Sequence, residues 1–325
     1  MIYSRKEYFA DLQKHMVNYL ALNYDYYYLK YTHERNRMIG AENMILGTSH
    51  AMNGVECALL PGGRENNINL SVSSQDLFCD LLHAKKAIAE GKKKIKTCVI
   101  NMGYYLLYQD LSLSKTMGRN IERVYVPLFG EEAVHNKKET ESYDFSLTMG
   151  CDRKLYPEEY VMGLTEHWIK GFFNENPDYY NTLLTRENNN ILGLKKIEWN
   201  AMTEEEKRSY AGERVGSHNS MIRYKESFSE NEMLLDELVT LLAGNNIRTI
   251  IMITPFTRIY KELIDPRFKK EMLEVTERIN YPVEFFDMNE LEGIFDDGDF
   301  LDTDHLNAEG AVKCSQLLAE YLEMF

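Results

Sequence analysis

The sequence has no apolar run that approaches the roughly 20 residues needed to span a bilayer, and its first residues, MIYSRKEYFADLQKHM, lack the apolar core of a signal peptide. Cysteines are few, five in 325 residues, and none stands in a CxxC pair. That pattern argues against a disulfide scaffold or a zinc knuckle and favours reduced thiols. We therefore expect a soluble, cytoplasmic protein with no integral membrane segment.

A basic excess is also missing. The chain has 37 Lys and Arg against 51 Asp and Glu, a net charge of −14, which argues against a nucleic-acid or anionic-membrane partner. Neither the glycine fingerprint of a Rossmann site nor a phosphate-binding P-loop is present. His83, His135 and His167 have no metal-ligand spacing around them. We expect no cofactor and no metal.

The sequence does contain short apolar runs that alternate with amphipathic segments. The apolar runs predict strands at residues 43–49, 67–72, 96–103, 248–255 and 283–287. The amphipathic segments predict helices at residues 5–35, 74–90, 229–243, 266–280 and 307–323. We expect Ser73 or Ser74 to cap the second helix, and Ser229 with Glu232 to form a capping box at the start of the third.

Strands alternating with helices predict a mostly parallel sheet covered on both faces, a three-layer α/β/α sandwich with a flavodoxin-like sheet. Residues 106–225 lose this rhythm, and we interpret them as a largely helical insertion, a cap or lid, within one domain spanning 1–325. The 22 tyrosines suit packing and also the half-wet clefts that bind carbohydrate. The cluster from Tyr24 to Tyr28 indicates either packing or the surface of a homodimer.

Sites in such sheets lie at the carboxyl ends of the strands, and Ser49 stands there in Gly47-Thr-Ser-His, at a turn that would expose its hydroxyl. Much later, Asp302-Thr-Asp-His305 has an Asp three residues before a His. Asp302 could hold the imidazole Nδ1 while the other ring nitrogen faces a nucleophile. One alternative is a solvated loop with a helix cap at Asp304 or Asn307. Another is a calcium loop built from the acidic run 296–304.

Together these segments resemble the SGNH/GDSL hydrolase superfamily, in residue type and in order along the chain. Gly47-Thr-Ser49 resembles the nucleophile block, and Asn69-Leu-Ser-Val-Ser-Ser74 the second block, with serines where glycines are usual. Asp302 and His305 match the last block, and the resemblance covers roughly residues 40–105 and 228–325. It implies the SGNH hydrolase fold, with Ser49 as nucleophile, His305 as base, Asp302 as its partner, and the N–H groups of Ser49 and Ser71 in an oxyanion hole.

The third block departs from the family pattern. Where Gly-x-Asn-Asp is usual, the chain reads Gly103-Tyr-Tyr-Leu106, so Tyr105 occupies the position of the Asn that donates to the oxyanion. Loss of one such donor typically costs about 2.7–4 kcal/mol of transition-state stabilisation. Either the hydroxyl of Tyr105 or Tyr104 serves instead, or another group does, or the catalyst is weak or absent. Variant third blocks of this kind resemble divergent members that modify bacterial polysaccharides and cell-wall polymers, some of which are O-acyltransferases.

Further candidates for substrate contact are His50, Tyr104, Arg214 and His218. His50 either lines the acyl pocket or bonds a neighbouring loop. Arg214 and His218 are four residues apart and would share a helix face. They either reach over the cleft to an anionic or sugar substrate, or belong to a structural ion pair or a solvated face.

The expected function is that of a serine-dependent esterase that removes O-acyl groups, expected to be acetyl, from a carbohydrate or a cell-surface polymer. The same triad could serve an O-acyltransferase of polysaccharide biosynthesis. The alternative from another class is a non-catalytic SGNH-like module that binds carbohydrate or a protein partner.

Overall fold

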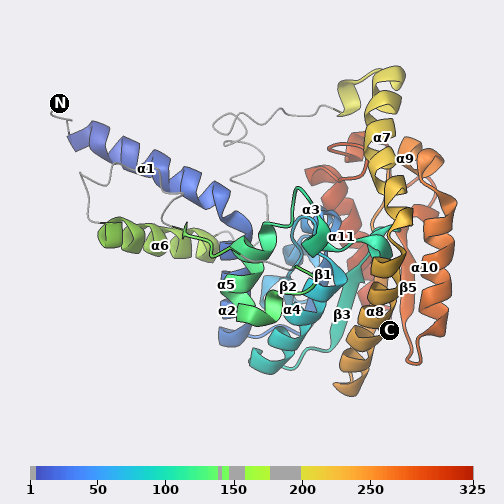
Figure 1. Ribbon diagram of the computed structural model, residues 1–325, viewed down its shortest axis with the longest axis horizontal. Helices are drawn as coiled ribbons and strands as arrows, with labels where there is room; N and C mark the ends of the chain where they lie inside the picture. The colour runs from blue at the N-terminus through green and yellow to red at the C-terminus, as the bar shows by residue number, and fades with distance from the viewer. Residues whose placement is uncertain (1–4, 138–140, 146–157, 176–198, 325) are drawn as a thin grey trace.

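Five parallel strands form the centre of the protein (Figure 1). The computed structural model describes residues 5–137, 141–145, 158–175 and 199–324. The strands lie in the order β2-β1-β3-β4-β5, the 2-1-3-4-5 order of flavodoxin-like doubly wound sheets. The expected α/β class with a parallel sheet is therefore confirmed. The strands are β1 (Asn43–Gly47), β2 (Asn67–Asn69), β3 (Thr97–Asn101), β4 (Arg248–Ile253) and β5 (Glu284–Asp287).

Side chains of the central strands point alternately into two separate hydrophobic clusters. In β1, Met44 and Leu46 belong to one cluster and Ile45 to the other. Strands buried on both faces need apolar residues at every position, which is why these runs are continuously apolar. The in-register pairing of Asn43 with Thr97 and of Gly47 with Asn101 aligns the carboxyl ends of β1 and β3.

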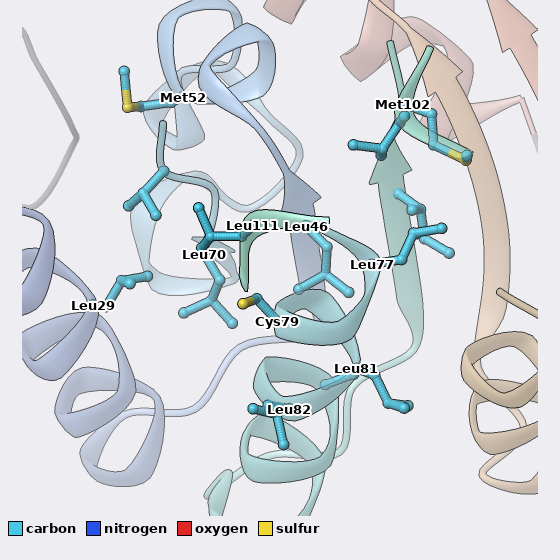
Figure 2. Close-up of a cluster of buried hydrophobic side chains, with 14 of the residues drawn as sticks. Leu29, Leu46, Met52, Leu70, Leu77, Cys79, Leu81, Leu82, Met102 and Leu111 are labelled. Atoms are coloured by element: carbon cyan, nitrogen blue, oxygen red, sulfur yellow. The ribbon is translucent and has the colours of Figure 1, made fainter. Parts of the chain in front are cut away.

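Helices cover both faces of the sheet, which gives three layers. One face carries α2 (Tyr24–Met38), α4 (Leu77–Glu90), α8 (Lys225–Gly244) and α10 (Pro266–Arg278). The other carries α3 (Ser49–Gly54) and α11 (Ala308–Glu323). Figure 2 shows Leu46 of β1 between the sheet and α4, in one cluster with Leu77 and Leu81. Each fully buried Leu contributes about 1.5–3 kcal/mol to folding.

The remaining helices are α1 (Arg5–Leu22), α5 (Val126–Phe129), α6 (Glu158–Glu175), α7 (Glu204–Asn219) and α9 (Arg258–Leu263). A π-helical turn spans Ile121–Tyr125. Short 3₁₀ turns span Cys57–Leu59, Gly63–Glu65, Leu106–Tyr108, Leu111–Leu113, Gly130–Ala133, Trp199–Ala201, Ser220–Arg223, Met288–Glu290 and Asp297–Asp299. None of the helices in the described ranges is long and apolar enough to cross a membrane.

Three expected helix boundaries were wrong. The helix expected over 5–35 is two helices that meet at Asn23, whose φ of −118° and ψ of 18° depart from helical values and whose side chain donates to Tyr19 O. Helix α4 is capped by Asp76, which accepts from Cys79 N, and not by Ser73 or Ser74.

The third error concerns α8, which begins at Lys225, so Ser229 lies within it and forms no capping box with Glu232. The Ser229 hydroxyl donates to the carbonyl of Lys225 instead.

The described residues of the insertion, 106–137, 141–145, 158–175 and 199–225, form helices and helical turns without a strand. Helix α6 extends away from the sheet on the same side of the molecule as α1 (Figure 1). Of the tyrosine cluster, Tyr24, Tyr27 and Tyr28 are buried in the core, so packing accounts for these three. The homodimer stays a prediction.

Candidate active site

A tight turn at the end of β1 presents Ser49. Gly47 has φ +137°, and a Cβ added there would lie 2.5 Å from the carbonyl oxygen of Asn101. The position therefore requires glycine, both for its backbone conformation and for the close approach of β3. Thr48 is extended and caps α3, so Ser49 becomes the first residue of that helix, half-buried beside a pocket.

Ser49, His305 and Asp302 meet through hydrogen bonds. Ser49 Oγ lies 2.8 Å from His305 Nε2. His305 Nδ1 lies 3.0 and 2.9 Å from the two carboxylate oxygens of Asp302. A carboxylate only accepts hydrogen bonds, so the imidazole proton is on Nδ1 and Nε2 is free to accept from the serine hydroxyl. This is the geometry of a serine nucleophile, a base and an orienting acid.

The spacing of Asp302 and His305 follows from the conformation of their loop. Asp302 Oδ1 accepts from the backbone N–H of Asp304 at 3.0 Å and from that of His305 at 2.8 Å. The same carboxylate thus holds both the loop and the imidazole ring. Asn307, and not Asp304, then caps α11 by accepting from two backbone N–H groups of its first turn.

A second carboxylate lies next to the base. The Asp304 side chain is fully buried, and Arg214 of α7 donates to it from Nε at 3.2 and 3.1 Å and from Nη2 at 3.0 Å. His50 Nε2 lies 3.2 Å from its Oδ2. His305 Nδ1 lies 3.6 Å from its Oδ1. Asp304 therefore lies in contact with His50, His305 and Arg214 of α7.

This arrangement sets the charges in the site. Burial alone would lower the pKa of His305, but Asp304 and Asp302 outweigh burial and raise it. Burial alone would raise the pKa of Asp304, but His305, His50 and Arg214 hold it well below its usual range. Burial lowers the pKa of His50, which therefore stays neutral at neutral pH. His305 consequently faces a carboxylate that is ionised at neutral pH.

Two expected substrate contacts are placed elsewhere. His50 is buried and does not line the pocket. It bonds Asp304 instead, in agreement with the second option given above, a bond to a neighbouring loop. The Tyr104 hydroxyl donates to Asp287 Oδ2 at 2.6 Å. Tyr104 is buried and is not among the residues that line the pocket beside Ser49, so its contact with substrate stays a prediction.

The Ser71 amide is not free to enter an oxyanion hole. Its N–H donates to Asn69 Oδ1 at 3.1 Å, and Ser71 is fully buried. The Asn69 amide nitrogen donates to the carbonyls of Ala51 and Val55 at 3.0 and 3.2 Å. Asn69 thus joins the end of β2 to α3, and the sequence-based assignment of the Ser71 amide was wrong because this side chain takes its proton.

Tyr105, Arg214 and His218 line the same pocket as Ser49. The rings of Tyr105 and His218 stack with their centroids 3.9 Å apart, and His218 Nδ1 lies 2.7 Å from the hydroxyl of Tyr260. Burial, and then Arg214, lower the pKa of His218 to about 3, so the ring is neutral. Burial raises the pKa of Tyr105, so its hydroxyl stays protonated as a hydrogen-bond donor.

Ser74 lines the pocket as well, which the sequence did not reveal. It has φ +60°, a left-handed conformation that is uncommon for serine. Its carbonyl accepts from Gln109 Nε2 at 2.8 Å. The sequence feature that could have indicated Ser74 is a serine in the second block, where glycine is usual in the superfamily that the chain resembles.

The pocket itself has a volume of about 630 Å³. Apart from Thr48, Ser49 and Ser74, its walls come from two segments, 105–117 and 214–227. Both segments belong almost wholly to the expected insertion.

Metal-ligand types come together at two places in the described part of the chain. One is His50 with Asp304 and His305, and the other is Asp110 with His135 and Glu230. In the first, Ser49, Asp302 and Arg214 already bind these polar atoms. In the second, the Asn136 amide donates to both carboxylates, at 2.9 and 2.7 Å. Hydrogen bonds within the chain therefore account for both groups.

The acidic run expected as an alternative calcium loop divides its carboxylates among separate partners. Asp297 pairs with Lys207 at 2.6 Å, and Asp299 pairs with Lys313 at 2.8 Å. Asp296 caps the short turn at 297–299.

Comparison of the sequence with models of known protein families finds no match, and no curated protein matches it either.

Proposed function

We propose that the chain is a serine-dependent SGNH/GDSL-type esterase that removes O-acyl, most simply O-acetyl, groups from a carbohydrate or a cell-surface polymer. The observation that carries the proposal is the chain of hydrogen bonds from Ser49 Oγ to His305 Nε2 at 2.8 Å and from His305 Nδ1 to Asp302 at 2.9 Å. The strand order β2-β1-β3-β4-β5 and the position of Ser49 after β1 support it.

His305 takes the proton of the Ser49 hydroxyl as the oxygen attacks the acyl carbonyl, and Asp302 stabilises the imidazolium. The departing alcohol receives that proton, and the acyl group stays on Ser49 until water removes it. With the Ser71 amide engaged by Asn69, the donors left for the oxyanion are the Ser49 amide and the Tyr105 hydroxyl. A donor of this kind is worth about 2.7–4 kcal/mol.

Treatment with a fluorophosphonate, followed by mass mapping of the adduct, tests the proposal. Wild-type protein should be labelled on Ser49, and Ser49→Ala should not be labelled. Ser217→Ala is the matched control, because Ser217 lines the same pocket outside the triad. Absence of label from the wild type, or equal labelling of Ser49→Ala, would refute the enzyme and leave a non-catalytic binding module.

An O-acyltransferase with the same triad is the second candidate. Its support is the pocket volume of about 630 Å³, which far exceeds an acetyl group and leaves room for a hydroxyl acceptor. Hydrolysis of 4-nitrophenyl acetate with and without added oligosaccharide separates the two. Acetylated oligosaccharide among the products indicates transfer, and acetate alone indicates hydrolysis.

A further inference from the structure

The walls of the pocket carry a charge opposite to that of the protein. The charged side chains along segments 105–117 and 214–227 of the wall are Lys115, Arg214 and Arg223, against the single acid Asp110. The chain as a whole has a net charge of −14. The pocket wall therefore has more cationic than acidic side chains, whereas the chain as a whole has more acidic ones.

The acid and one of the cations are already engaged. Asp110 Oδ1 accepts from Ser112 N at 2.8 Å, and its Oδ2 accepts from Asn136 at 2.9 Å. Arg214 is paired with Asp304. The charge of Arg214 is therefore balanced within the chain, whereas Asp110 is held by neutral donors and keeps its charge.

Lys115 and Arg223 differ from them. Both are exposed, and no acidic side chain among the described residues forms an ion pair with either. The guanidinium of Arg223 rests over the ring of Tyr224, 4.9 Å from its centroid, which holds it beside the pocket. An Arg held in this way suits the planar, two-oxygen geometry of a carboxylate or a phosphate.

We infer that the pocket takes an acyl ester whose sugar part carries a negative charge, a carboxylate or a phosphate, bound by Lys115 and Arg223. This inference rests on the proposed function, because that function places the ester at Ser49. The acyl group occupies the Ser49 end, and the sugar extends between the two wall segments toward the cations. Tyr224, with 43% of its surface exposed, offers an aromatic face at the same wall.

The test measures binding in Ser49→Ala, which cannot turn the esters over, so it does not depend on catalysis. Three ligands differ only at one carbon: O-acetylglucose, O-acetylglucuronic acid and O-acetylglucose 6-phosphate. Calorimetry at low salt should give a Kd about fivefold or more lower for the charged sugars, as expected for an ion pair of about 1 kcal/mol. The difference should shrink at high salt. The two charged ligands distinguish a carboxylate from a phosphate site.

Lys115→Glu and Arg223→Glu, each made in Ser49→Ala, should abolish this preference and leave the Kd of O-acetylglucose unchanged. The neutral forms Lys115→Gln and Arg223→Gln should weaken it. Lys94→Glu is the matched control, an exposed lysine before β3 at the opposite end of the strands. Equal Kd values for all three ligands would overturn the inference. Failure of Ser49 labelling, with the preference intact, would overturn only the proposed esterase.

Discussion

Arg214 of α7 and Asp304 of the loop before α11 form an ion pair, with Nη2 3.0 Å from Oδ2, and the same carboxylate lies 3.6 Å from His305 Nδ1. Helix α7, which belongs to the expected insertion, is thus bonded directly to the residue before His305. Asp302 orients His305, whereas Asp304 acts on it mainly through charge. The two carboxylates should therefore be separable by mutation.

Asp304→Asn should move the acidic limb of the kcat/KM profile to lower pH. In the wild type the pKa of His305 is raised, so activity should fall as the pH drops through a value above 6.5, the usual pKa of His. Removing the negative charge of Asp304 lowers that pKa. Profiles with 4-nitrophenyl acetate measure the shift, and unfolding curves show whether the fold is intact.

Asp302→Asn is the comparison. It should cut kcat by about three to four orders of magnitude, because the imidazole loses its orienting acceptor. An acidic limb that stays in place in Asp304→Asn would contradict the electrostatic role of Asp304.

Gly47→Ala should destabilise the protein by about 2–4 kcal/mol, because the methyl would clash with the Asn101 carbonyl at a positive φ. Labelling of Ser49 should slow as well, since the turn that presents it shifts. Gly212→Ala in α7 is the control: its Cβ meets nothing within 4 Å, so it should stabilise by about 0.5–1 kcal/mol. Similar effects of the two substitutions in urea unfolding would refute the account of Gly47.

Ser74→Gly should raise the free energy of unfolding by about 0.5–1 kcal/mol, because glycine adopts φ +60° without strain. The backbone beside Ser49 would keep its path, so kcat should be retained. Asn246→Gly, at φ +55° before β4, should gain less because asparagine tolerates this region. A loss of stability in Ser74→Gly would show that the serine side chain makes a contact that outweighs the strain.

Asp80→Asn should flatten the pH dependence of stability. Burial raises the pKa of Asp80 to about 8, against the opposing hydrogen bond from the Gln75 side chain. The unfolded chain ionises near 3.8 while the folded protein keeps the proton to about 8. Stability should therefore fall as the pH rises across this window.

The asparagine side chain does not ionise. The free energy of unfolding of Asp80→Asn, measured in urea, should therefore increasingly exceed that of the wild type between pH 5 and 8. Glu226→Gln, which removes an exposed carboxyl, is the control. Parallel stability curves for Asp80→Asn and wild type would contradict the raised pKa.

Much of the fold was readable from the sequence because a short, continuous apolar run such as that of β4 is typical of a strand buried on both faces of a sheet. The association of Ser49 with Asp302 and His305 followed from residue type and order, and the structure brings the three together. Helix starts were less predictable. Asp76 and Ser74 are both acceptable caps by local rules, and only the backbone path, with Ser74 left-handed, decides between them.

The polar network around the triad was not predictable, because its partners come from distant segments. Asp304 looked like a helix cap, and nothing local indicates that His50 and Arg214 would both bind it. Likewise, the Ser71 amide is taken by Asn69, a contact set by the turn after β2 and not by any periodicity. Such contacts depend on the tertiary structure.

The contact between Ser49 and His305 joins residues 256 positions apart. During synthesis Ser49 emerges long before His305, so in the nascent chain no imidazole lies beside the Ser49 hydroxyl. Under the proposed function, Ser49 becomes nucleophilic only when β1 and the loop before α11 reach their final places. Labelling of Ser49 by a fluorophosphonate would then report that these two segments have come together, and molecules in which they are apart should stay unlabelled.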